Sequence, residues 1–135
     1  MSDGRDPSEA IRGQVYLPHY LLRVSSLSGV NLLPAVDSVA TGKAFFTLNA
    51  LDGTAQAIVR VANMAPAGVV LFRANNLNST GNGRVLYSLE AQGGYWRLPS
   101  GAMFGVNDFN DIGRGRLIVI AASENYPMGE IGGRI

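Results

Sequence analysis

The sequence contains no cysteine and only one histidine, His19. The absence of cysteine excludes disulfides, thiolate metal sites and a cysteine nucleophile. A copper or zinc centre needs several imidazole or thiolate ligands, and a single histidine cannot supply them. His19 follows Pro18 in a turn-like sequence, where we expect a structural role. We therefore predict a protein without a metal centre of this type and without another cofactor.

Charged residues are also scarce, at 16% of the 135 residues, against ~25% in an ordinary globular domain. The net charge of +1 argues against nucleic acid as a partner, because the basic residues are too few and too scattered to attract a phosphate backbone. Hydrophobic residues make up 47% of the chain. A small domain of this composition exposes apolar surface, and such surfaces often meet other subunits.

Long hydrophobic runs are missing as well. No apolar stretch approaches the ~18–20 residues of a membrane-spanning helix, so we expect no membrane insertion. The polar start of the sequence, residues 1–10, lacks the basic and apolar regions of a signal peptide. The localisation stays open. One possibility is an extracellular or particle surface, which the protein would reach without a signal peptide or after removal of a leader.

The hydrophobic segments that are present are short, rich in Val, Ile, Phe and Tyr, and separated by Gly, Asn, Asp and Pro. This pattern is typical of β-strands joined by turns. It predicts strands at residues 11–17, 20–27, 42–49, 55–63, 68–74, 83–90, 94–98, 116–122 and 129–135. Residues 100–113 are the least regular part and should hold a short helical turn or a long loop.

Alternation along these strands predicts which side chains face the interior. The predicted interior faces of residues 42–49 and 55–63 carry Ala44, Phe46, Leu48, Ala55, Ala57, Val59 and Val61. The strand at residues 116–122 is instead apolar on both faces, so that Ile118 and Ile120 also need cover. Either a neighbouring segment of the chain or another subunit must provide it.

Two stretches resemble the chordin (CHRD) domain, a module of the secreted regulator chordin and of many bacterial proteins. The first starts at Leu27-Ser28-Gly29 and ends at Leu48, and the second is Asn125 to Ile135, with Gly129-Glu130-Ile131 at its centre. The resemblance spans roughly residues 25–135. It implies an immunoglobulin-like β-sandwich related in shape to copper–zinc superoxide dismutase.

The strand pattern and the resemblance together predict an all-β fold, an antiparallel β-sandwich of about seven to nine strands. Residues 18–135 would form the CHRD-like domain. Residues 1–17 would form an N-terminal arm and first strand that docks either on its own domain or on a neighbouring subunit. The arm contributes Ile11, Val15 and Tyr16 to the candidate interface residues.

The sequence departs from the family at positions where many members carry histidine. The corresponding positions here are Val70, Phe72 and Ala122, all apolar. Two imidazoles placed two residues apart on a strand face the same way and can share a metal or a ligand. Their replacement predicts ordinary core or interface at this place.

Few residues suggest a ligand site. Tyr95, Trp96 and Arg97 are of the types that anchor interfaces and bind sugar rings, although Trp96 would equally suit the core. Glu130 is expected to pair with an arginine, and Arg134, Arg116 and Arg12 are the candidates.

Residues 107–111 gather oxygen ligands of the kind that calcium prefers, with Asp108, Asn110 and Asp111 as weak candidates. This segment lacks the spacing and the distal glutamate of an EF-hand, so a solvated turn is the other interpretation.

Nothing in the sequence assembles a catalytic group, so we expect a protein that is not an enzyme. The leading hypothesis is a structural subunit that self-assembles into a homo-oligomer, fibre or particle surface. Its candidate interface residues are the three in the N-terminal arm together with Tyr95, Trp96, Arg97, Ile118 and Ile120. The alternative is a monomeric module that binds a protein or carbohydrate ligand.

Overall fold

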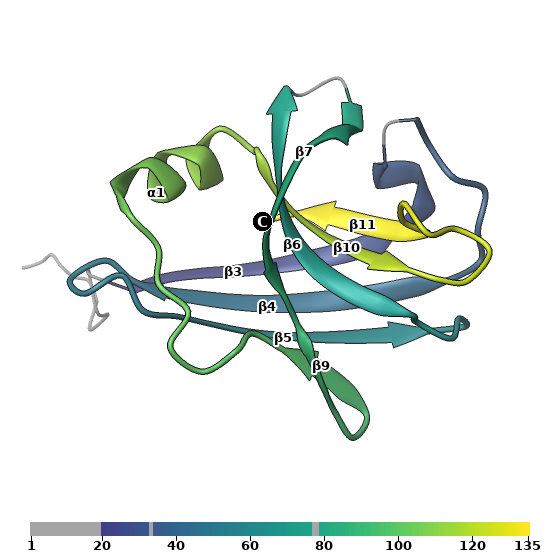
Figure 1. Ribbon diagram of the computed structural model, residues 1–135, viewed down its shortest axis with the longest axis horizontal. Helices are drawn as coiled ribbons and strands as arrows, with labels where there is room; N and C mark the ends of the chain where they lie inside the picture. The colour runs from purple at the N-terminus through teal and green to yellow at the C-terminus, as the bar shows by residue number, and fades with distance from the viewer. Residues whose placement is uncertain (1–19, 33, 77–78) are drawn as a thin grey trace, which may run out of the picture.

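The computed structural model describes residues 20–32, 34–76 and 79–135 (Figure 1). The predicted strand at residues 11–17 lies outside the described residues. The described part contains nine β-strands, one α-helix and one 3-10 helix. The elements are β3 (Tyr20–Ser28), η1 (Gly29–Asn31), β4 (Thr41–Asn49), β5 (Ala55–Ala62), β6 (Gly68–Asn76), β7 (Ser79–Ser88), β8 (Glu90–Gln92), β9 (Tyr95–Arg97), α1 (Val106–Gly113), β10 (Leu117–Ala122) and β11 (Ile131–Arg134).

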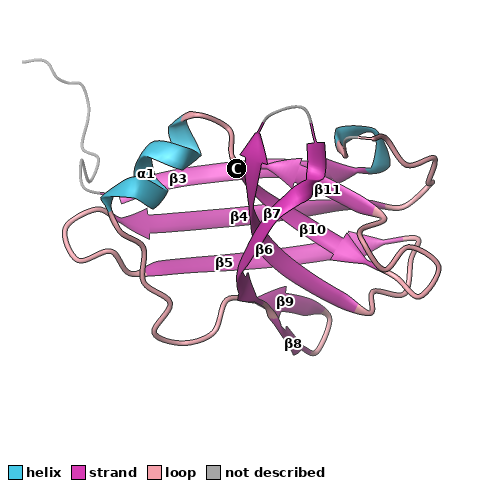
Figure 2. Cartoon of the chain, turned by 45° about the horizontal axis from the view of Figure 1, so that its top comes forward, coloured by secondary structure: helices cyan, strands magenta, loops and turns pink. Residues whose placement is uncertain are grey.

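The nine strands form a single antiparallel sheet in the order β7-β6-β10-β11-β3-β4-β5-β9-β8. In Figures 1 and 2, β6 and β7 cross in front of β3, β4 and β5, so the sheet folds over itself. The outermost strands of this order, β7 and β8, are consecutive in the chain, and only Leu89 separates them. The predicted all-β antiparallel fold is confirmed, and its two layers belong to one continuous sheet.

The core lies between the two layers and is built from alternate residues of the strands. Phe46, Leu48 and Val59 are each at most 1% exposed. They belong to one buried cluster that also contains Leu71 of β6 and Val119 of β10. The predicted alternation is confirmed, because the intervening residues of β4 and β5 face outward and are largely exposed.

One predicted strand has different boundaries, and the irregular segment takes one of its two predicted forms. The strand predicted at residues 83–90 starts earlier, at Ser79, and stops at Ser88, because Leu89 turns into the core and is only 6% exposed. The irregular segment at residues 100–113 contains α1, the first of its two alternatives. The helix begins after Gly105, whose N–H donates to the Oδ2 of Asp108 over 2.9 Å. This carboxylate satisfies a backbone donor that the first helical turn leaves unpaired.

Candidate functional site: two apolar faces of one sheet

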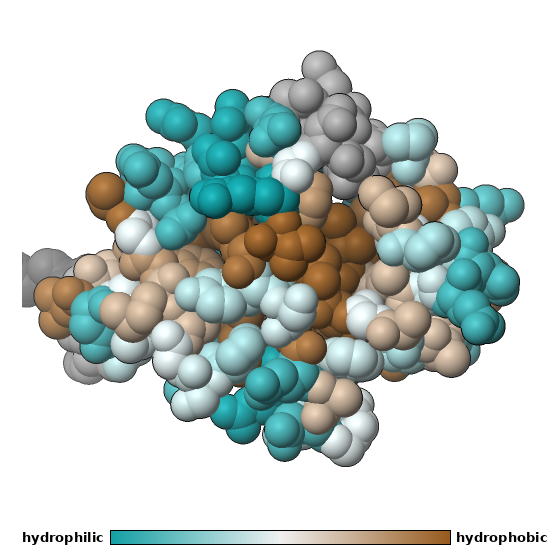
Figure 3. Space-filling view, viewed as in Figure 1, coloured by the Kyte–Doolittle hydropathy of each residue, from teal (hydrophilic) through white to brown (hydrophobic). Residues whose placement is uncertain are grey.

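The face of β6 and β10 that points away from the core holds Val70, Phe72, Ile118 and Ile120, and we call it the covered face. Ile118 and Ile120 are 1% and 5% exposed. They cluster with Leu32 and Val36, which lie in the connection from η1 to β4. Figure 3 shows hydrophobic side chains gathered over the middle of the molecule, where Figure 1 places β6 and β10. Of the two predicted kinds of cover for this strand, the structure shows a neighbouring segment of the same chain.

The connection that covers this face is fastened to the end of the chain. The Nδ2 of Asn31 donates to the carbonyl oxygens of Ser26 and Gly132 over 3.0 and 2.9 Å. The hydroxyl of Ser38 donates to the Oε2 of Glu130 over 2.6 Å. The two stretches that resemble the CHRD domain are therefore neighbours in space, and side-chain hydrogen bonds join them.

Of the arginine partners suggested for Glu130, Arg12 lies outside the described residues, and in the described part the Glu130 carboxylate contacts hydroxyl groups. Hydrogen bonds from the hydroxyls of Ser123 and Ser38 lower the pKa of Glu130 below its ordinary value of 4.5. Arg134 instead donates from its Nε to the carbonyl oxygen of Gly115 over 2.8 Å. The carboxylate of Glu130 is thus a structural acceptor that holds the covering connection, because its hydroxyl partners favour the charged form.

Two glycines of the closing stretch allow its close approach to β3 and to the covering connection. A Cβ at Gly133 would lie 2.6 Å from the carbonyl oxygen of Ser26, and one at Gly132 would lie 2.7 Å from Leu32. Any larger residue would push the strands apart at this place. The Gly132-Gly133 pair therefore has a packing role.

The outward face of β3, β4 and β5 differs from the covered face because its apolar side chains are exposed. We call it the open face. Val24, Phe45 and Ile58 occupy directly opposite positions across the three strands. The exposed fractions of its large apolar side chains are 47% for Tyr20, 66% for Leu22, 56% for Val24, 44% for Phe45 and 43% for Ile58. Contiguous exposed apolar surface of this kind is typical of interaction sites.

Basic side chains border the open face. Lys43 and Arg60 are directly opposite each other on β4 and β5, one row along from Phe45 and Ile58. Both are exposed. The Arg60 guanidinium lies 5.8 Å from the centre of the Tyr95 ring. Like charges opposite each other on a sheet destabilise it, so this pair, which we call the basic row, favours an anionic partner.

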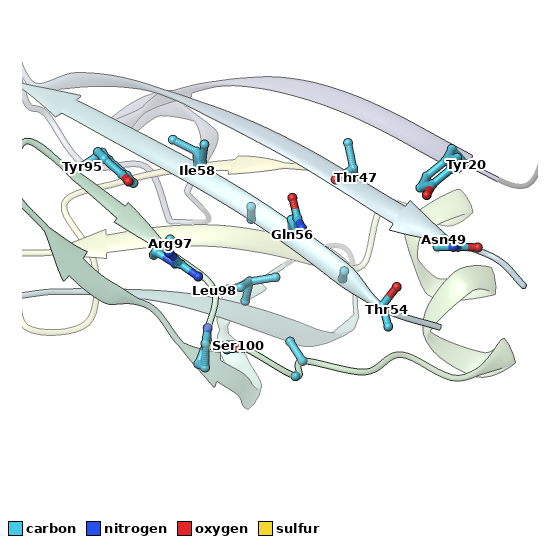
Figure 4. Close-up of a pocket in the computed structure, with 15 residues that line it drawn as sticks. Tyr20, Thr47, Asn49, Thr54, Gln56, Ile58, Tyr95, Arg97, Leu98 and Ser100 are labelled. Atoms are coloured by element: carbon cyan, nitrogen blue, oxygen red, sulfur yellow. The ribbon is translucent and has the colours of Figure 1, made fainter. Parts of the chain in front are cut away.

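A groove runs along the outer side of β5, next to the open face (Figure 4). Its volume is about 660 Å³. The labelled side chains in Figure 4 place Tyr95 near one end and Tyr20 near the other, with Gln56 between them. The far wall is the segment that follows β9, from Leu98 to Ala102.

The groove has a mixed polar and apolar lining and carries little charge. Arg97 lies opposite Ile58 on β5 and opposite Glu90 on β8. Within the described residues, no ion pair or hydrogen bond engages the Arg97 guanidinium or the Gln56 amide. These groups are available to a ligand that brings hydroxyl, amide or carboxylate groups.

The structure separates the residues of the predicted Tyr95–Arg97 site. Tyr95 and Arg97 face outward and line the groove. Trp96 points to the opposite side, where it packs against the main core. Ile118 and Ile120 are buried under their own chain, so neither is available on the surface. Ile11, Val15 and Tyr16 lie outside the described residues.

Two of the three candidate calcium ligands, Asp108 and Asp111, are engaged within the chain. Asp108 caps α1, and Asp111, 3% exposed, forms an ion pair with Arg73 of β6. This contact raises the pKa of Arg73 above its ordinary value. No group of three His, Cys, Asp or Glu side chains in the described ranges is arranged to hold a metal. Calcium binding stays a prediction.

The three apolar positions at which the resemblance implies histidines in other members lie on one surface. Val70 and Phe72 lie opposite Ile120 and Ile118, and Ala122 follows two residues later on β10, opposite Gly68. All three side chains therefore belong to the same face of adjacent strands. That surface is the covered face, and the three side chains there are apolar.

The CHRD domain family model matches residues 23–135. The chain belongs to the CHRD domain family. A comparison with curated proteins finds no match, and a comparison with solved structures finds none either. The match begins within β3 and includes the whole of the two faces except the first residues of that strand. In the described part of this CHRD domain, no helix is long and apolar enough to cross a membrane.

The open face is the feature that sequence reasoning missed. Leu22, Val24, Phe45 and Ile58 were not among the candidate interface residues. A signal for them was present, since Phe45 and Ile58 each occupy an apolar position in an otherwise polar row of alternation. Whether these apolar residues lie side by side depends on the register of the strand pairing, which alternation alone does not specify.

Proposed function

We propose that this CHRD domain is a non-enzymatic subunit that self-associates through its open face. The observation that supports this proposal is the contiguity of Tyr20, Leu22, Val24, Phe45 and Ile58 on one exposed sheet surface. Burial of this surface against a second copy would remove apolar area from water, at about 25 cal/mol per Å². Ile118 and Ile120 of the covered face are already buried within the chain, whereas five large apolar side chains of the open face are exposed.

The experiment compares Leu22→Ser with Leu51→Ser by analytical ultracentrifugation over a range of concentrations. Leu22 is on the open face, whereas Leu51 is 77% exposed in the turn between β4 and β5. The wild type and Leu51→Ser should self-associate, and Leu22→Ser should shift toward monomer. A wild type that stays monomeric at high concentration contradicts the proposal.

The groove supports a second candidate function, the binding of a carbohydrate or peptide by a monomer. Two tyrosines near the ends of the groove and the unengaged Arg97 and Gln56 favour it. Aromatic faces and bidentate amide or guanidinium groups are suited to polyhydroxyl or carboxylate ligands. A titration with acidic oligosaccharides, followed by amide NMR shifts, should perturb β5 and β9 in the wild type and not in Arg97→Ala. Unperturbed wild-type shifts would remove this candidate.

A further inference from the structure

The open face presents a problem for simple face-to-face pairing of two copies. Its basic row, Lys43 and Arg60, would approach the same row of a second copy in many symmetric arrangements. The outward positions of β3, β4, β5 and β9 hold no acidic residue in the described part of the chain. The open face is apolar in one part and basic in the next. A segment that is apolar in one part and acidic in the next complements it better than a second copy of the same face does.

The chain itself contains such a segment. Residues 1–9 carry Asp3, Asp6 and Glu9 against Arg5 alone, and the apolar residues Ile11 and Val15 follow. The nineteen residues before β3 are long enough to cross the face, because an extended chain spans ~3.3 Å per residue. We infer that residues 1–17 of a neighbouring copy cover the open face, an inference that rests on the proposed self-association.

The order of residues on the two surfaces agrees for an antiparallel arrangement. Along β3, the face is apolar at Leu22 and Val24 and then meets the basic row at Ser26, whose hydroxyl accepts from the Nζ of Lys43 over 3.1 Å. A segment that runs in the opposite direction places its apolar residues over the first part. Its acidic residues then reach Lys43 and Arg60. The acidic side chains would relieve the repulsion within the basic row.

Pro18 favours a neighbouring copy over the chain's own segment. To cover its own face, the segment would have to reverse just before β3 begins at Tyr20. Two-residue hairpin turns of types I′ and II′ need a positive φ at their first central position, which proline cannot adopt, and the residue before a proline is restricted to extended backbone. A segment directed away from its own domain instead reaches another copy, as in strand exchange between identical subunits.

The absence of cysteine from the chain allows this inference to be tested by disulfide trapping. We would mix the single variants Glu9→Cys and Lys43→Cys and follow the disulfide-linked heterodimer on non-reducing gels. The control mixes Glu9→Cys with Leu51→Cys, whose site is also exposed but lies off the face, in the turn between β4 and β5. We expect the heterodimer to form several times faster with Lys43→Cys than with Leu51→Cys. Equal rates would overturn the inference.

A charge exchange completes the test. Asp3→Lys, Asp6→Lys and Glu9→Lys together should weaken self-association about tenfold, because they replace attraction to the basic row by repulsion. Lys43→Glu with Arg60→Glu should weaken it similarly, and the combination should restore it. If Leu22→Ser abolishes association while neither charge variant alters it, the proposed function stands and the segment is not the occupant. If the double variant Glu9→Cys/Lys43→Cys forms only an intramolecular disulfide, the segment covers its own domain and the exchange between copies is wrong.

Discussion

The covered face and the open face are both apolar surfaces on the outside of the same sheet, yet they differ in how far their side chains are exposed to solvent. On the covered face, Ile118 and Ile120 are at most 5% exposed, because the connection from η1 to β4 packs over them. On the open face, Leu22 and Phe45 remain 66% and 44% exposed. The composition of a strand therefore does not determine whether its outward face is buried. The path of a connecting segment determines it.

The largest effect should follow from truncating the covered face. Ile118→Ala removes side-chain volume from a site that is 1% exposed, so we expect a loss of about 3 kcal/mol in the free energy of unfolding. Urea denaturation measures this loss. A change below ~1 kcal/mol would show that the covering connection is not firmly packed.

A smaller loss is expected where the closing stretch approaches β3. Gly133→Ala would place a methyl group 2.6 Å from the carbonyl oxygen of Ser26, so we expect a loss of about 1–3 kcal/mol. Gly68→Ala is the matched control, because no atom lies within 4 Å of a Cβ at that position. The thermal unfolding midpoint should fall for Gly133→Ala and stay near the wild-type value for Gly68→Ala.

The hydrogen bond between Ser38 and Glu130, which holds the covering connection, should contribute less to stability, and its contribution should depend on pH. Glu130→Gln removes a charged acceptor, and we expect a loss of about 1 kcal/mol at neutral pH. The pKa of Glu130 is lowered in the folded state, so its stabilisation is present above the ordinary pKa of 4.5 and is lost as the pH falls through the folded value.

The difference between wild type and Glu130→Gln should therefore shrink in acid. Urea unfolding at pH 7 and at successively lower pH measures it. A difference that stays constant with pH would mean that the charge of Glu130 does not contribute, and Ser38→Ala offers an independent check of the same hydrogen bond.

The smallest effect on stability belongs to the open face. Leu22→Ala at a protein concentration that keeps the chain monomeric should change the free energy of unfolding by less than ~0.5 kcal/mol, because the side chain is 66% exposed. A loss as large as that of Ile118→Ala would mean that the face is already packed within the monomer, and the contrast between the two faces would fail.

Much of the fold could be predicted from local pattern. Alternation identified the interior positions of β4 and β5, and turn residues separated nearly every strand. The division of the predicted strand at residues 83–90 was missed because Leu89 is apolar and continues the run in sequence, although it turns into the core.

The candidate site was harder to predict because it depends on contacts between distant segments. The strand at residues 116–122 is apolar on both faces, and its sequence did not indicate which segment covers the outward face. The covering residues Leu32 and Val36 lie at least eighty positions earlier in the chain. The partner of Glu130 was assigned by charge, whereas the fold brings hydroxyls to it. The open face appears only when Val24, Phe45 and Ile58 are aligned by strand pairing.

The succession of β7 and β8 in the chain has a consequence for the kind of assembly available to this domain. A sheet normally grows into aggregates by adding strands at its unpaired edges. Here both edges belong to one continuous stretch around Leu89, whose N–H donates to the Val69 carbonyl oxygen over 2.8 Å. One edge strand, β8, has only three residues, and the pairing of the other, β7, with β6 is interrupted by register shifts. A short edge strand and an irregular one both disfavour amyloid-like growth from these edges.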